Sequence, residues 1–158
     1  MIRQATAEDW ELLRDVRLRA LADSPEAFLD TVEEASAFQE SRWRSRAEPT
    51  DTQACFLRED GSGMVSCFVA DDPKTAFLVA MWVAPEQRGT RVARELVERV
   101  VAWARDRDAD AARVALSVEP GNDRAARLYE KCGFAETDDP PPFPYEPGPD
   151  NRFYVLEL

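Results

Sequence analysis

The sequence predicts an α+β domain built on a single mixed, mostly antiparallel sheet flanked by helices, and three observations lead to that prediction. Helical periodicity near the N-terminus gives way to short extended segments in the middle of the chain. The run from Ala76 to Val83 is nearly continuous in apolar residues, as in a central strand that is buried on both faces. Helix, strand, helix and a last strand then follow, an order that is typical of helices flanking one sheet.

Helix starts can be recognised in the N-terminal third because the spacing of a capping box occurs twice. Thr6 with Asp9, and Thr31 with Glu34, place a hydroxyl residue three positions before an acidic one. Between them, Ser24-Pro25 has the pattern of an N-cap followed by proline at the first position of a short turn. We expect a strand at 2–4 and helices at about 6–21 and 31–46.

Turn residues and periodicity define the rest of the chain. Asp60-Gly61-Ser62-Gly63 predicts the turn of an antiparallel hairpin. Gly133 can take the left-handed conformation that closes a helix, with Phe134 as the apolar contact. The proline-rich segment 138–149 cannot form a ladder or a helix interior, so we expect a loop there. The expected strands are 55–58, 64–69, 76–83, 114–118 and 152–158, and the expected helices follow Gly89 and begin near Asn122.

Composition indicates a soluble globular chain with an acidic surface. With 158 residues, 44% hydrophobic and 32% charged, we expect one domain spanning 1–158. No apolar run reaches the roughly 18 residues that cross a bilayer, and no leader pattern opens the chain, so we expect a cytoplasmic protein without membrane contact. The formal net charge of −11 argues against nucleic-acid binding. It would attract a cationic substrate, or it serves solubility alone.

The missing residue types restrict the chemistry. The chain has no histidine, which excludes Ser-His-Asp and Cys-His catalysis and most zinc hydrolase sites. Cys55, Cys67 and Cys132 have neither disulfide nor zinc spacing, so we expect reduced core thiols and no metal site. Any chemistry must use carboxylates, tyrosine, lysine, cysteine, water or a cofactor.

The segment 83–93 joins the buried strand to a helix and has the features of a phosphate site. Free backbone N–H groups and the positive end of a helix dipole attract phosphate oxygens, and Gly89 lets the backbone approach closely. Many glycine-containing turns bind nothing, so the local chemistry leaves both interpretations open. Neither a P-loop nor a Gly-x-Gly-x-x-Gly dinucleotide motif is present in the sequence.

Two motifs in order resemble the GNAT acetyltransferase superfamily. The loop is similar to its Arg/Gln-x-x-Gly-x-Gly/Ala pattern, with Arg88 first and Ala93 last, although Arg91 stands where the central glycine is most common. That departure either alters the loop conformation or adds a charge beside the phosphates. Segment 122–134 is similar to Asn-x-x-Ala-x-x-Leu-Tyr-x-x-x-Gly-Phe, with every named position filled. The resemblance covers about Val83 to Phe134.

The resemblance implies that acetyl-CoA is bound in a V-shaped opening between the strand ending at Val83 and the strand ending near Glu119. Backbone groups around Met81 to Val83 would pair with the pantetheine arm, and the loop amides would hold the pyrophosphate. Asn122 would contact pantetheine, cap its helix, or do both. The implied cofactor residues are Met81, Trp82, Val83, Arg88, Gly89, Thr90, Arg91, Val92, Ala93, Asn122, Ala125 and Tyr129.

The implied reaction is direct attack of a neutral amine on the thioester in a ternary complex. By resemblance, Tyr129 would protonate the leaving thiolate, whereas its helical spacing alone favours a core tyrosine. Acyl-cysteine chemistry at Cys132 is a minor alternative. Many relatives carry a glutamate on the strand before the loop, and 76–81 contains none. Glu119 is the candidate base, with Glu33 and Glu34 also placed near the opening by the predicted order of elements, and a water relay or no dedicated base as alternatives.

The acceptor would be a small-molecule or peptide amine whose identity the sequence leaves open. Its site would use the first two helices and the proline-rich loop, and each aromatic wall residue could instead belong to the core. The candidates are Phe28, Glu33, Glu34, Trp43, Trp82, Phe143 and Tyr145. A CoA-binding sensor domain without turnover is the alternative function. We expect a monomer or a homodimer.

Overall fold

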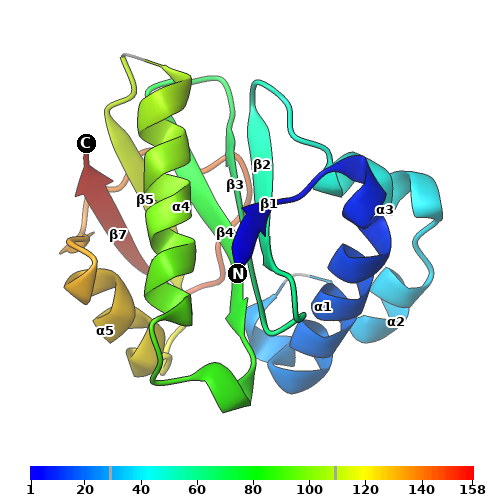
Figure 1. The fold of residues 1–158 in the computed structure, drawn as a ribbon. Helices are drawn as coiled ribbons and strands as arrows, with labels where there is room; N and C mark the ends of the chain where they lie inside the picture. Colours follow the sequence, from blue (N-terminus) through cyan, green and yellow to red (C-terminus); the bar gives the residue numbers. More distant parts are fainter. Residues whose placement is uncertain (29, 109) are drawn as a thin grey trace.

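The computed structural model describes residues 1–28, 30–108 and 110–158, and its strands form one sheet (Figure 1). The sheet has seven strands in the order β1-β2-β3-β4-β5-β7-β6. Only β4 and β5 pair in parallel, and the other neighbours are antiparallel. This confirms the expected single, mixed and mostly antiparallel sheet. The strands are β1 (Ile2–Gln4), β2 (Gln53–Arg58), β3 (Gly63–Val69), β4 (Thr75–Val83), β5 (Arg113–Val118), β6 (Ala135–Thr137) and β7 (Arg152–Glu157).

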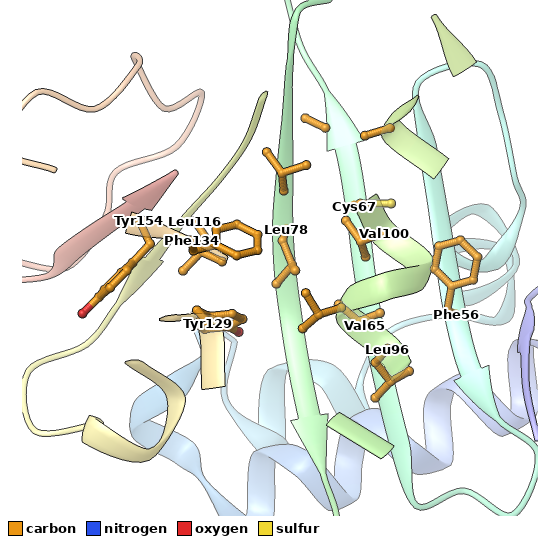
Figure 2. Packing of buried hydrophobic residues seen from close by; sticks show 14 of the residues in the cluster. Phe56, Val65, Cys67, Leu78, Leu96, Val100, Leu116, Tyr129, Phe134 and Tyr154 are labelled. Carbon is orange, nitrogen blue, oxygen red and sulfur yellow. The ribbon is translucent and has the colours of Figure 1, made fainter. Parts of the chain in front are cut away.

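Helices cover both faces of the sheet and create two apolar cores. In Figure 1, α4 lies across one face, while α1, α2 and α3 are grouped beside the end formed by β1 and β2. Figure 2 shows Leu96 and Val100 of α4 pointing toward Val65 in the first core. Leu13 and Trp43 belong to the second core. The helices are α1 (Trp10–Asp23), α2 (Val32–Ser36), α3 (Glu40–Ala47), α4 (Val92–Arg107) and α5 (Asp123–Lys131), with short 3-10 turns η1 (Ala7–Asp9), η2 (Pro25–Ala27) and η3 (Pro85–Gln87).

The predicted helix and strand starts are confirmed with two differences. The helix expected over 31–46 is divided into α2 and α3. Gln39 adopts an extended conformation between them, and the turn lets Phe38 pack against Trp43 with ring centroids 5.6 Å apart. The short edge strand β6 is not predicted, because three mostly exposed residues carry no periodic pattern and pair only through β7. The proline-rich segment forms a loop, as expected.

Two helix starts and one helix end have the capping contacts that their residues predict. Asp9 and Thr6 form the capping box at η1, and the Thr31 hydroxyl accepts from the Glu34 amide at 3.1 Å. Gly133 has a φ of 100°, and the Phe134 amide after it donates to the Tyr129 carbonyl at 3.0 Å. These contacts fix where α5 ends and place Tyr129 against the sheet.

The sheet opens between β4 and β5, and this opening positions the site. Parallel pairing is confined to residues 75–77 of β4 and 113–115 of β5. Beyond Phe77 the two strands have no ladder between them, so the edge of β4 that faces β5 is unpaired. On the other edge, the β3–β4 register shifts between Met64 and Ser66, where Ala80 takes a φ of 54°. A bulge of this kind bends the strand and redirects its backbone groups.

Candidate active site

A cleft of about 460 Å³ occupies the opening between β4 and β5. Residues 78–83 of β4 line one side, and residues 116–119 at the end of β5 line the other. The start of α4 and one face of α5 close the two ends. The cleft is therefore bounded by two unpaired strand edges and by the helix terminus that follows the glycine-containing loop.

The loop between β4 and α4 leaves backbone donors free at the helix start. Gly89 has a φ of 81°, and no atom lies within 4 Å of where a Cβ would stand. Arg91 is the N-cap residue of α4, in an ordinary right-handed conformation, and its side chain makes no capping hydrogen bond. The Val92 amide donates to Thr90 Oγ1 at 3.3 Å, and Val92 does not line the cleft. Because the first amides of a helix have no intrahelical acceptor, the amide of Ala93, which does line the cleft, can donate to a phosphate oxygen. Arg91 thus keeps the loop turn without the glycine that the motif usually has there.

The Arg88 side chain anchors this loop to two other elements. Its Nε donates to the Val83 carbonyl at 3.1 Å, and its Nη2 contacts Asp23 Oδ2 at 2.5 Å. The indole of Trp82 donates to the same Asp23 oxygen at 3.0 Å. Donation by Trp82 and by Arg88 holds the pKa of the Asp23 carboxyl below its usual range. Asp23 at the end of α1 therefore ties the loop to the end of β4, and no pattern in the sequence predicts this role.

Basic side chains dominate the charged lining of the cleft. Repulsion between cations and the positive end of α4 is unfavourable in the empty site and is relieved by a bound anion. Glu119 is the single acidic side chain in the described lining. The basic residues are Arg88, Arg91, Arg94, Arg124, Arg127 and Lys131. This local charge is opposite to the net charge of −11 of the whole chain.

Asn122 is the N-cap of α5 and also contacts the candidate base. Its Oδ1 accepts from the Ala125 amide at 3.2 Å, and its Nδ2 donates to Glu119 Oε1 at 2.6 Å. The capping role that its residue type predicts is confirmed. Asn122 and Ala125 both line the cleft, so the Asn122 amide nitrogen, which has a second hydrogen, can also reach a ligand.

Tyr129 belongs to the first core and also lines the cleft. Its side chain is 5% exposed, it lines the cleft, and its ring packs against Phe134 with centroids 5.7 Å apart (Figure 2). Burial, followed by the negative charge of Glu119, raises the pKa of the phenol above its usual value. The hydroxyl therefore stays protonated at neutral pH and can act as a donor. Burial also raises the pKa of the Cys132 thiol, which lines the cleft, and this disfavours the thiolate that acyl-cysteine chemistry needs.

A second cavity of about 540 Å³ adjoins the cleft on the sheet face that carries α1 and α3. The two cavities share the residues at their junction, among them Phe28, Ala80 and Glu119. Trp43 and Tyr145, expected at the acceptor site, line the second cavity. This arrangement lets a molecule in the second cavity approach the middle of the cleft.

Other predicted acceptor residues lie elsewhere. Glu33 and Glu34 are exposed on α2 and line neither cavity. Phe143 also lines neither of them, because it packs against Phe77 and Phe153 at centroid distances of 5.0 and 5.3 Å. The Trp82 ring belongs to the second core, while residue 82 borders the cofactor cleft only.

The structure adds three charged residues that the sequence analysis missed. Arg17, Asp30 and Arg46 line the second cavity, and both guanidinium groups contact Asp30 Oδ2 at 3.4 Å. Arg17 lies four residues after Leu13 and four before Leu21, on the buried stripe of α1. The charge of Arg17 within this apolar stripe is the one sequence feature that could have pointed to its place in the cavity. Asp30 and Arg46 belong to other segments and carry no local signal.

Among residues 1–28, 30–108 and 110–158, no group of three or more histidine, cysteine, aspartate or glutamate side chains could hold a metal ion. No helix within those ranges is long and apolar enough to span a bilayer.

Comparison with known proteins identifies relatives over most of the chain. A family model described as the acetyltransferase (GNAT) family matches residues 14–134. Mycothiol acetyltransferase from Thermobispora bispora is 33% identical over 135 residues, covering 80% of this chain and 43% of that protein. The chain therefore spans less than half the length of this relative.

Solved structures with the same fold include several acetyltransferases. An acetyltransferase from Streptococcus agalactiae has a TM-score of 0.75 and 25% identity, covering 100% of this chain and 98% of that one. The GNAT domain of S. lividans PAT has a TM-score of 0.76 at 16% identity, covering 99% and 89%. PaiA N-acetyltransferase from Thermoplasma acidophilum, solved in complex with coenzyme A, has a TM-score of 0.71 at 14% identity, covering 100% and 98%. At these lower identities the last two likenesses establish the fold alone.

Proposed function

Because this chain belongs to the GNAT acetyltransferase family, we propose that it transfers the acetyl group of acetyl-CoA to a primary amine. One observation carries the proposal: the cleft between the unpaired edges of β4 and β5 is lined by arginines and by the start of α4, whose N-cap residue Arg91 makes no capping hydrogen bond. Pantetheine would lie along the strand edges. The pyrophosphate oxygens would accept hydrogen bonds from the free backbone amides at the start of α4.

The acetyl group would be held at the junction of the two cavities. The bulge at Ala80 frees backbone groups of β4 at this point, where they can polarise the thioester carbonyl. The amine nitrogen attacks the carbonyl carbon, a C–N bond forms, and the C–S bond breaks with its electron pair left on sulfur. The products are an N-acetylated amine and coenzyme A.

Protons must move at both the sulfur and the nitrogen during this reaction. The Tyr129 phenol, kept protonated by burial, would donate to the departing sulfur and regain a proton from solvent afterwards. The nitrogen loses one proton before attack, since an alkyl ammonium with a pKa of about 10 is not a nucleophile, and a second proton after the C–N bond forms, which leaves the neutral amide. Glu119 borders both cavities and is the proposed acceptor of the proton lost from nitrogen, directly or through water. Asn122 would orient the Glu119 carboxylate through its 2.6 Å hydrogen bond.

A panel of primary amines incubated with acetyl-CoA tests the proposed function. We expect coenzyme A thiol to be released in proportion to N-acetylated amine, measured by thiol titration and mass spectrometry. The N,N-dimethyl counterpart of each active amine is the matched control, because a tertiary amine cannot form a stable amide. Cofactor binding without turnover over the whole panel would contradict the proposal and favour a CoA-binding sensor domain.

A further inference from the structure

One wall of the second cavity contains hydrogen-bond donors that have no acceptor within the described part of the chain. They are Nε and Nη1 of Arg17 and Nε1 of Trp43. Both residues line the cavity and are more than nine-tenths buried, with 9% of Arg17 and 1% of Trp43 exposed. Leaving a buried donor unpaired destabilises the folded protein, and a charged donor does so more than a neutral one. Neighbouring side chains cover these three atoms, so an oxygen-bearing ligand in the cavity would pair with them once a covering side chain moves aside.

The same wall carries excess positive charge. Arg17 and Arg46 share the single carboxylate of Asp30, with each N–O distance at 3.4 Å. This cluster by itself, with two guanidinium cations and one carboxylate, carries a net charge of about +1. Besides Asp30 and Glu119, the lining contains two further acidic residues, Glu26 of η2 and Glu146 of the loop before β7. Burial lowers the pKa of the Arg17 guanidinium, and the nearby Asp30 charge opposes that shift. An anionic oxygen group would supply both the missing acceptor and the missing charge.

At the end of the cavity that adjoins the cleft, the charged side chain is the acidic Glu119. Glu119 borders both cavities, which places it at the junction where the thioester would lie. Arg17, Trp43 and Arg46 line the second cavity only, so they are away from the cleft. A ligand with a positive amine and a negative group would match both ends. A volume of about 540 Å³ accommodates a molecule of amino-acid size.

We propose that the acceptor is a primary amine that also bears a carboxylate, bound by Arg17, Trp43 and Arg46 while its amine lies beside Glu119. This inference rests on the proposed acetyl transfer and specifies its substrate class. The Phe28 ring lies 4.5 Å from the Arg17 guanidinium carbon and borders both cavities. In the proposed complex, the Phe28 ring would move aside and the carboxylate of the acceptor would bind beside Arg17. Packing alone would be served by an apolar side chain, which would avoid the cost of burying unpaired guanidinium donors.

Matched acceptor pairs test the assignment. Each pair consists of an amino acid and the amine that lacks only its carboxylate, such as lysine with cadaverine or phenylalanine with phenethylamine. We expect kcat/KM to favour the carboxylate-bearing member of the preferred pair about 10- to 100-fold, the range expected of a charged hydrogen bond. In R17M this ratio falls toward one through KM for the acceptor, whereas KM for acetyl-CoA is unchanged. R14M removes the same charge from the exposed side of α1 and should keep the ratio.

Binding to the coenzyme A-saturated protein provides a readout that does not need turnover. Carboxylate-bearing amines should raise its melting temperature more than their decarboxylated partners, and R17M should abolish the difference. R46M provides a second test if R17M fails to fold. Equal acetylation of both members of every pair would overturn this inference and leave the proposed transfer intact. Selective carboxylate binding without turnover would overturn only the transfer. A preference that survives both R17M and R46M would overturn the assignment of the site.

Discussion

The position of Tyr129 is compatible with two roles, that of a core residue and that of a proton donor. Its ring lies in the core with Phe134, and its pKa is raised by burial and by Glu119. A phenol with a raised pKa is a poor acid in the free protein but remains fully protonated at neutral pH. It can therefore stabilise developing charge on sulfur as the C–S bond breaks.

Tyr129→Phe separates the two roles because it removes one oxygen and keeps the ring. No hydrogen bond from this hydroxyl is formed within the described residues, so the melting temperature should change little. If the hydroxyl protonates the thiolate, kcat should fall by roughly 10²–10⁴. The loss should be near the low end, because the thiolate of coenzyme A is already a fair leaving group. Affinity for acetyl-CoA should remain nearly constant.

Measuring kcat, acetyl-CoA affinity and melting temperature for both proteins distinguishes three cases. An unchanged kcat would assign Tyr129 to the core and leave solvent as the acid. Parallel losses in melting temperature and affinity would mean that the substitution damaged packing. A fall in kcat alone supports the donor role, since a group used only in the transition state leaves ground-state binding unchanged.

At the scale of single elements, the start of α1 is held by one carboxylate with several partners. The Arg3 guanidinium of β1 donates hydrogen bonds to Asp9 Oδ1 at 2.6 Å and to Asp9 Oδ2 at 2.8 Å. The Thr6 amide donates to the same Oδ2 at 2.8 Å. These contacts connect the first strand to the first helix. The Arg3 hydrogen bond is the main cause that lowers the pKa of Asp9 from 3.8 to about 2.

Asp9 should make the fold sensitive to acid. Because its folded-state pKa lies below its ordinary value, the ionised carboxylate stabilises the fold above about pH 4, and this contribution disappears as pH falls toward 2. Arg3 is 41% exposed, so we reduce the expected contribution to about 1–2 kcal/mol. Asp9→Asn should lower the free energy of unfolding by that amount at pH 6 and flatten its dependence below pH 4.

Urea unfolding at pH 6, 4 and 3 measures this difference. Asp15→Asn is the control, since Asp15 is exposed on α1 and forms an ion pair with the adjacent Arg14. An Asp9→Asn protein that loses stability between pH 4 and 3 as steeply as the parent would refute the assignment to Asp9.

For the molecule as a whole, the open sheet leaves a cleft that a ligand can close. The edges of β4 and β5, the start of α4 and one face of α5 are separate in sequence, and acetyl-CoA would bridge them. A ligand that binds only the folded state stabilises it by mass action, by about 2.7 kcal/mol at a hundredfold excess over Kd. We therefore expect acetyl-CoA to raise the melting temperature, and no shift at millimolar ligand would exclude the cofactor.

Gly89→Val should abolish this shift without unfolding the protein. A side chain at a φ of 81° is strained, and its β-carbon would project into the open space where phosphate is expected. Gly121→Val is the matched control, because Gly121 has a φ of 84°, equally open surroundings and no place in the cleft lining. Both variants should lose similar stability without ligand. Only Gly121→Val should still respond to acetyl-CoA.

Local patterns in the sequence determined the fold class, most elements and the donor half of the site. Capping pairs, the apolar run of β4, Gly89 and the Asn122 to Phe134 motif act within short stretches of chain. Their effects therefore do not depend on distant contacts. Asn122 shows this most directly, because its residue type predicted a cap and the structure has one.

Tertiary structure decided the acceptor half, because that half is made where distant segments meet. Arg17, Asp30 and Arg46 come together only when α1 and α3 pack on the sheet, and Tyr145 reaches the same cavity from the loop before β7. Glu33 and Glu34 have the right chemistry for an acceptor site, but α2 leaves both exposed. A charge in an apolar stripe marks Arg17 as unusual. Only the packing of three chain segments gives that charge a cavity and a shared carboxylate.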